Sequence, residues 1–185
     1  MKNYKTALLI FLALALCLSL TACGKAVPGK KVLVRDIMAN DYIFKNADLQ
    51  ITSFEITQRQ TRKNDMKDYV WVTIRAENRY GAYDASYKLT YELFNDGWKL
   101  SVCSCTDRVV TPNSYPTEKE VLDNVYESGY TKVTVESTSF INDRAGFILT
   151  GYKDGECWNI SRGCTFSFES GWSELTGLAQ KQYDW

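Results

Sequence analysis

The chain has 185 residues, with 22 basic and 22 acidic side chains and no histidine. This balanced charge excludes a strongly basic nucleic-acid-binding protein. Because histidine is missing, Ser-His and Cys-His catalytic pairs and the commonest metal ligand are excluded as well. Aromatic residues make up 14% of the chain and proline occurs three times, so the composition favours a β-rich core.

The first 22 residues carry the features of a signal peptide. Lys2 and Lys5 precede an apolar run that ends in Leu20-Thr21-Ala22-Cys23. This ending resembles the lipobox of bacterial lipoproteins, with an ordinary secretory signal as the alternative. The resemblance implies that Cys23 is lipidated and becomes the N-terminus. Its lipid would anchor the protein at the extracytoplasmic face of the cell membrane.

The first predicted unit covers residues 32–105, after a flexible lipidated tether at residues 23–31. Apolar positions at helical spacing predict a helix from Val32 that is interrupted at Asn40-Asp41. The strands that follow are expected at residues 49–59, 68–77, 83–94 and 98–105. In the third of them, aromatic and aliphatic residues alternate with polar ones, and an Asn-Asp-Gly turn then leads into Trp98.

The second predicted unit covers residues 116–185, after a linker at residues 106–115 that contains Pro112. Thr117 and Glu120 form a capping box before an apolar stripe, and Gly129 fits the position that follows a helix. The strands of this unit are expected at residues 132–140, 146–152, 157–169 and from Trp172 onward.

A glycine-tryptophan hairpin occurs in both units, as Gly97-Trp98 and Gly171-Trp172. Together with the repeated order of elements, it predicts an α+β fold of two tandem units, each with one helix packed on a four-stranded antiparallel sheet. Trp98 and Trp172 are expected at equivalent positions, as buried residues that begin the fourth strands. This arrangement resembles tandem cystatin-like or NTF2-like units, which host binding, inhibition, scaffolding and a few enzymes.

Four cysteines follow the lipobox, namely Cys103, Cys105, Cys157 and Cys164. Their even number in an exported protein favours disulfides. Strand alternation places Cys103 and Cys105 on the face opposite Leu100, and it places Cys164 among aromatic residues. One bridge between the two units is therefore favoured, with Cys164 as a buried free thiol. Zinc and copper sites are disfavoured, because no Cys-x-x-Cys spacing is present and the cysteine faces do not converge. A redox Cys-x-Cys site is disfavoured, because no helix N-terminus is expected beside these thiols to lower their pKa.

Few polar residues stand out as candidate site residues. Asp65 and Asp68 could act as an acid and base pair, but solvated loop charges are favoured. Arg162 lies on an apolar row and is a candidate binding cation, although a bulge at Gly163 that turns it outward is favoured. Tyr80 and Tyr83 are candidate binding residues within a group of tyrosines that more often forms core packing.

The sequence thus predicts a cell-envelope lipoprotein that acts as a non-catalytic binding module. We expect no cofactor and no metal, and the expected partners are the membrane, through the lipid at Cys23, and an envelope protein or glycan, but not nucleic acid. Two alternatives stay open. One is an inhibitor or accessory subunit of an extracytoplasmic enzyme, and the other is an NTF2-like pocket for a small molecule.

Overall fold

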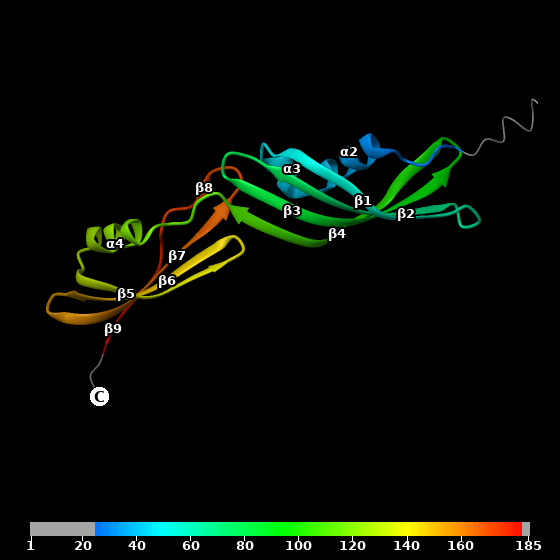
Figure 1. Cartoon of the computed structure of the whole chain (residues 1–185). Coiled ribbons are helices and arrows are strands. Elements are labelled where there is room, and N and C mark those ends of the chain that lie inside the picture. Colours follow the sequence, from blue (N-terminus) through cyan, green and yellow to red (C-terminus); the bar gives the residue numbers. More distant parts are fainter. Residues whose placement is uncertain (1–24, 183–185) are drawn as a thin grey trace, which may run out of the picture.

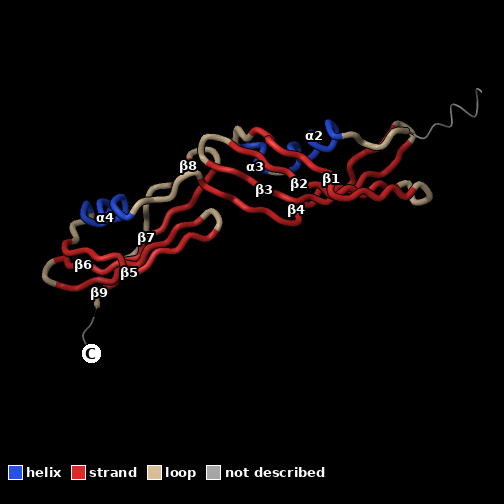
Figure 2. The backbone as a smooth tube through the Cα atoms, viewed as in Figure 1, coloured by secondary structure: helices blue, strands red, loops and turns tan. Residues whose placement is uncertain are grey.

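The computed structural model describes residues 25–182, so the predicted signal peptide and the lipobox cysteine lie outside the described residues. The described chain forms two antiparallel sheets placed end to end, with its first and last residues at opposite ends of an elongated molecule (Figure 1). Strands dominate both halves, and the helices are short segments laid beside them (Figure 2).

The first sheet has the order β1-β2-β3-β4, with each strand antiparallel to its neighbour. Its strands are β1 (Gln50–Arg62), β2 (Lys67–Glu77), β3 (Gly81–Phe94) and β4 (Gly97–Pro112). All four were predicted, but β4 is longer than expected. Residues 106–112, predicted to be linker, continue β4, because residues 107–112 pair with residues 81–86 of β3.

Two short helices cover one face of this sheet, α2 (Lys30–Asn40) and α3 (Tyr42–Asn46). The predicted interruption at Asp41 is confirmed: the Asp41 side chain accepts a hydrogen bond from Ile43 N and begins α3 as its N-cap. Leu33 and Ile37 of α2 are fully buried against the sheet, as their helical spacing indicated.

The second sheet follows α4 (Glu118–Glu127). Its strands are β5 (Thr131–Ile141), β6 (Arg144–Lys153), β7 (Glu156–Ser167), β8 (Gly171–Trp172) and β9 (Ala179–Lys181). The predicted capping box is confirmed, since the Thr117 side chain accepts from Glu120 N and the Glu120 side chain accepts from Thr117 N. Gly129 has a φ of +88°, a left-handed conformation that suits the residue after a helix.

The predicted fold class is wrong. The structure is 59% strand and 16% helix, and it is not a tandem of one-helix, four-stranded units. The first sheet has two short helices instead of one, and the second sheet has five strands. The strand expected from Trp172 ends at that residue, and three-residue β9 resumes pairing with β7. The intervening segment contains Gly177 and exposes 81% of Leu178, so it has no alternating buried face.

The tether predicted at residues 23–31 also differs from the structure. Helix α2 already begins at Lys30, and the carbonyls of Lys25 and Pro28 accept hydrogen bonds from Trp98 and Arg59. This described part of the segment is therefore held against the first sheet. The sequence pattern did not predict these contacts, because both donors lie on strands that are far from this segment in the sequence.

Each sheet has its own hydrophobic core. The first core lies between the helices α2 and α3 and the first sheet, and the second lies between α4 and the second sheet. Phe166 and Phe168, at the end of β7 and just beyond it, pack into the first core, and Trp172 contacts both cores. The two halves thus share side chains although no strand of one sheet pairs with a strand of the other within residues 25–182.

Trp98 and Trp172 make corresponding contacts. Each follows a glycine with positive φ, +138° at Gly97 and +79° at Gly171. The Trp98 indole donates to the carbonyl of Lys25 (3.0 Å), and the Trp172 indole donates to that of Ser114 (2.7 Å). Both acceptors lie a few residues before the helix of their half, so each tryptophan fixes the chain that enters that helix. Both side chains are partly buried, less than predicted.

Candidate functional site

A cleft at the junction of the two halves is the best-formed candidate site. It has a volume of about 290 Å³ and draws its lining from both halves. One wall comes from α3 and β4, and the other comes from the turn between β5 and β6 and the end of β7. Such a position between two packed units is common for ligand and partner sites.

The floor of the junction cleft is apolar and closely packed. Phe166 and Phe168 are each less than one tenth exposed and pack edge to face with a ring separation of 5.2 Å. Phe168 also meets the Tyr83 ring edge to face at 6.0 Å, and its carbonyl accepts a 2.7 Å hydrogen bond from Asn78. These contacts fix the floor to the first sheet.

The rim of the cleft is polar and carries both signs of charge. On the side of the first half, the Arg108 guanidinium lies 5.7 Å from the centre of the Tyr42 ring and donates a 3.1 Å hydrogen bond to its hydroxyl. Both side chains are exposed. On the other half, Asp143 and Glu169 are exposed carboxylates, and the Asp143 carbonyl is held by Phe166 N at 2.7 Å.

Tyr83, a candidate binding residue from the sequence, is fully buried. Its hydroxyl donates to Asp41 at 3.0 Å, and that of Tyr87 donates to the same carboxylate. Tyr91 donates to Asp36 at 2.9 Å. Burial raises the pKa of all three phenols, and the hydrogen bonds to Asp36 and Asp41 raise the pKa of Tyr91 and Tyr87 further. These groups therefore stay protonated inside the core, and the structure gives Tyr83 a packing role.

Tyr80, the second candidate, is partly buried and lies outside the junction cleft. It lines a shallow groove on the neighbouring face with Arg79, whose guanidinium is 4.6 Å from the centre of its ring. Its ring also lies against Gly171, where a Cβ would come within 3.1 Å of it. Tyr80 thus supports the turn before Trp172.

Arg162, the third candidate, points into the second half and not outward. No bulge forms at Gly163, because the pairing of Arg162 with Phe147 and of Gly163 with Gly146 is regular. The guanidinium is buried beneath α4, where it donates to Asn124 Oδ1 at 3.0 Å and to Ser128 Oγ at 3.4 Å. A cation near the last turn of a helix is favourable, so Arg162 stabilises the end of α4.

The cysteines within residues 25–182 are all free thiols, so the predicted bridge between the halves does not form. Cys157 is the second residue of β7 and follows the hairpin between β6 and β7. This hairpin lies at the end of the second sheet that is farthest from the first sheet (Figure 1). A register shift between Leu100 and Val102 moves Cys103 to the core side of β4, where burial raises the pKa of its thiol to about 11. Cys164 is buried, as predicted, and burial raises the pKa of its thiol also.

The sequence patterns did not predict the residues that form the rim of the junction cleft. Tyr42, Arg108 and Asp143 belong to three elements with no shared motif, and the fold alone brings them together. The prediction that Asp68 is a solvated loop charge was wrong, because Asp68 is fully buried and forms an ion pair with Arg59.

Comparison with known proteins adds no assignment. No family model matches the sequence, and no curated protein matches it. Within residues 25–182, no group of three or more potential metal ligands is close enough to hold an ion. No helix in that range has the length and apolar character needed to cross a membrane.

Proposed function

We propose that this protein is a lipid-anchored, non-catalytic binding protein of the bacterial cell envelope, and that it holds a partner protein at the junction cleft. The lipobox-like sequence from Leu20 to Cys23 supports the location at the membrane. The junction cleft supports the binding role, because it joins a closely packed aromatic floor to a rim of exposed groups of both charges. The proposed binding role rests on this combination of floor and rim.

A binding role fits the positions of the carboxylates and phenols. Asp36 and Asp41 are the carboxylates nearest to the buried tyrosine hydroxyls, and both are nearly inaccessible to solvent. The Asp41 carboxylate accepts from Tyr83, Tyr87 and the Ile43 amide, which uses its lone pairs. Such groups stabilise the fold, and they offer a substrate neither a proton donor nor a base.

A protein partner is favoured by the strand that borders the cleft. Arg108 and Val110 lie near the end of β4, which is the last strand of its sheet and pairs only with β3 among the described strands. The free edge of such a strand presents backbone donors and acceptors to an extended segment of another chain. The apolar floor and the Tyr42-Arg108 pair would then receive side chains of that segment.

Site-specific photo-cross-linking in the native envelope tests this function. The variants carry benzoylphenylalanine in place of Tyr42 or Arg108, both of which are exposed at the rim. The matched control carries it in place of Val109, which lies next to Arg108 but on the other face of β4 and is 48% exposed. We expect one discrete adduct from the two rim positions and none from the control.

Affinity measurements with the cross-linked partner complete the test. Arg108→Glu should weaken its binding, whereas Val109→Thr should not. Equal adducts from the rim and control positions, or unchanged affinity of the Arg108→Glu variant, would contradict the role of the cleft. An extracytoplasmic enzyme as the captured partner would indicate an inhibitor or accessory subunit.

A further inference from the structure

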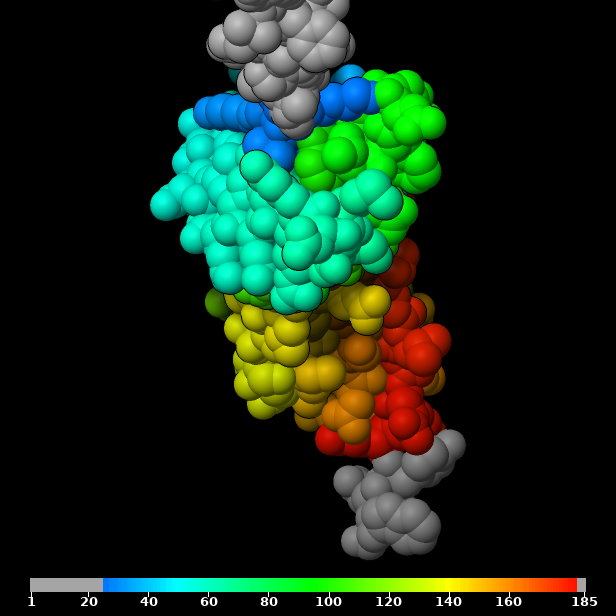
Figure 3. Space-filling model, turned by 90° about the vertical axis from the view of Figure 1, so that its right-hand side faces the viewer, coloured from blue at the N-terminus to red at the C-terminus, as the bar shows by residue number. Residues whose placement is uncertain are grey.

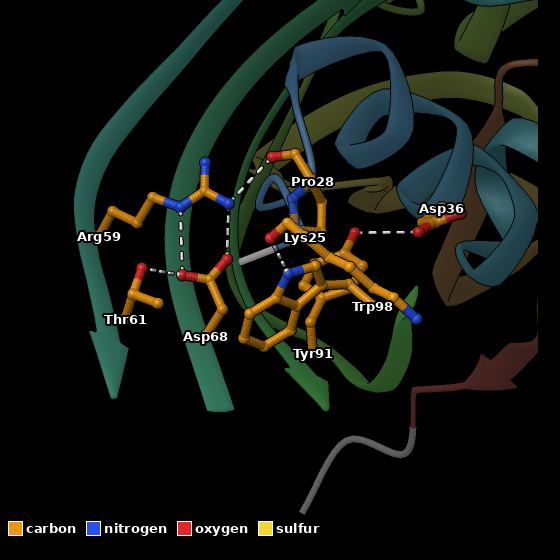
Figure 4. Close-up of polar contacts among 8 residues, drawn as sticks. All are labelled: Lys25, Pro28, Asp36, Arg59, Thr61, Asp68, Tyr91 and Trp98. Atoms are coloured by element: carbon orange, nitrogen blue, oxygen red, sulfur yellow. Dashed lines mark hydrogen bonds and ion pairs between the residues drawn. The ribbon is translucent and has the colours of Figure 1, made fainter. Parts of the chain in front are cut away.

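The first described residues are fixed to one end of the first sheet (Figure 4). Trp98 donates its indole hydrogen to the Lys25 carbonyl, and the Lys25 ammonium donates to the carbonyls of Phe94 (3.2 Å) and Asn95. Lys25 is therefore held at the hairpin between β3 and β4 through both its backbone and its side chain.

A buried ion pair holds the same segment at a second point. Arg59 Nη2 lies 2.5 Å from an oxygen of Asp68, which is fully buried and also accepts from the Thr61 hydroxyl at 2.7 Å. The same Nη2 donates to the carbonyl of buried Pro28 at 2.9 Å (Figure 4). Because a buried carboxylate keeps its partner in place, the path of residues 25–28 across the sheet is well defined.

The lipobox cysteine must therefore lie close to this end. Cys23 precedes Lys25 by two residues, and each residue spans at most about 3.6 Å. The Cys23 backbone is thus within about 7 Å of Lys25, whatever path the chain takes. A diacyl group on Cys23 would bring the membrane surface against the same end of the sheet.

This end is built like a membrane-contacting surface. We call it the proximal end and define it as residues 25–28, 62–67 and 93–99. Its two hairpins are joined by a 2.9 Å hydrogen bond from Leu93 N to the Met66 carbonyl. It exposes three apolar side chains, Val27 (37%), Met66 (55%) and Phe94 (48%). In Figure 3, which views this end, the blue start of the described chain lies next to the cyan and green hairpins.

The proximal end is also basic, although the chain as a whole has equal numbers of basic and acidic residues. Its basic residues are Lys25, Arg62, Lys63, Lys67 and Lys99, and its acidic residues are Asp65 and Asp96. The ion pairs Arg62–Asp65 and Lys99–Asp96 are solvent-exposed, and Lys67 forms a further, partly exposed pair with Glu92, which lies just outside the proximal end. With Glu92 included, basic side chains still outnumber acidic ones, and exposed pairs leave this excess of positive charge available to an anionic surface.

We propose that the proximal end docks onto the anionic surface of the membrane, with Met66 and Phe94 in the interfacial layer and the lysines among the headgroups. This inference rests on the proposed lipid anchor at Cys23. Docking makes the first sheet stand away from the membrane, because β3 runs from Phe94 at the proximal end to Gly81 at the junction. Its 14 residues span about 45 Å, which sets the distance of the junction cleft from the lipid.

Photo-methionine provides a direct test, because the chain has methionine only at positions 1, 38 and 66, and Met1 would be removed with the predicted signal peptide. The lipidated protein, made with the diazirine analogue of methionine, is reconstituted into phosphatidylglycerol vesicles and irradiated. We expect a phospholipid adduct on the peptide that contains Met66. Met38, which is 38% exposed on α2, is the internal control and should stay unlabelled.

Charge variants and changes of vesicle composition test whether the basic side chains of the proximal end attract it to anionic lipid. Lys63→Glu should lower the Met66 adduct yield, whereas Lys132→Glu, in the second half, should leave it unchanged. Replacing phosphatidylglycerol by phosphatidylcholine should lower the yield as well. An equal yield on both vesicles would overturn docking to an anionic surface.

The intact mass of the mature N-terminus separates the two proposals. An unmodified Cys23 would overturn both the anchor and the docking. A lipidated Cys23 with no Met66 adduct, or with equal adducts on Met38 and Met66, would overturn the docking alone and leave the proposed anchor standing.

Discussion

The two halves of the molecule use the same hairpin but fill their cores differently. In the first core, Asp36 and Asp41 bind the hydroxyls of buried tyrosines and so attach the helical segment to β3. Among residues 25–182, the second core contains no such pair of buried carboxylates. Its buried polar group is Arg162, whose contacts are with neutral groups, and the indole nitrogen of Trp158 is buried without a partner in the described chain.

This difference shows where the stability of each half comes from. Hydrogen bonds between buried charged and neutral groups are strong and directional, so the first half specifies the position of its helices by itself. The second half has shorter strands at its last edge, and it gives Phe166 and Phe168 to the first core. Because these side chains are shared, we expect the two halves to depend on each other for stability.

The largest expected effect is that of Phe168→Ala. Phe168 is 6% exposed and packs against Tyr83, so its truncation should cost about 3–5 kcal/mol of unfolding free energy. Ile141→Ala is the control, since Ile141 is 66% exposed on the same half. Hydrogen exchange should show that the amides of β2 and β3 lose protection in Phe168→Ala and keep it in Ile141→Ala. If protection were lost only in the second sheet, the sharing of the first core would be disproved.

Trp98→Ala and Trp172→Ala compare the corresponding hairpins directly. Each removes a partly buried indole and its hydrogen bond, so each should cost about 3 kcal/mol. Trp98→Ala should free residues 25–29 and leave the second sheet intact. Trp172→Ala should loosen both halves, because Trp172 contacts both cores. Hydrogen exchange distinguishes these outcomes, and melting temperatures that do not change would show that neither residue is structural.

Alkaline pH should weaken the first core specifically. The pKa of Tyr83, Tyr87 and Tyr91 is raised by burial above the ordinary value of 10.0, so folding keeps these protons bound when the unfolded chain loses them. Stability is therefore fully present below pH 10 and falls as pH rises, by roughly 2 kcal/mol at about pH 10.5. Urea titrations at several pH values measure how steeply the unfolding free energy falls with pH. This fall should be about one third shallower in Tyr91→Phe. An identical slope in that variant would exclude these phenols as the cause.

Much of the local structure could be predicted because its causes are local. Alternation at Tyr87, Leu89 and Tyr91 puts all three in the core, since side chains of a strand alternate between two faces. The capping box at Thr117 and the helix break at Asp41 rest on side chains that bond to backbone amides within three residues. These elements needed no distant partner to be recognised.

The candidate site and the end of the second sheet were decided by tertiary structure. The register shift that moves Cys103 to the core side depends on how β4 pairs with β3, and Arg162 stays buried because α4 supplies acceptors above it. Tyr42, Arg108 and Asp143 meet only once both halves have packed. A sequence pattern reports the preferences of neighbouring residues, whereas these contacts depend on the free energy of burying surfaces that lie far apart along the chain.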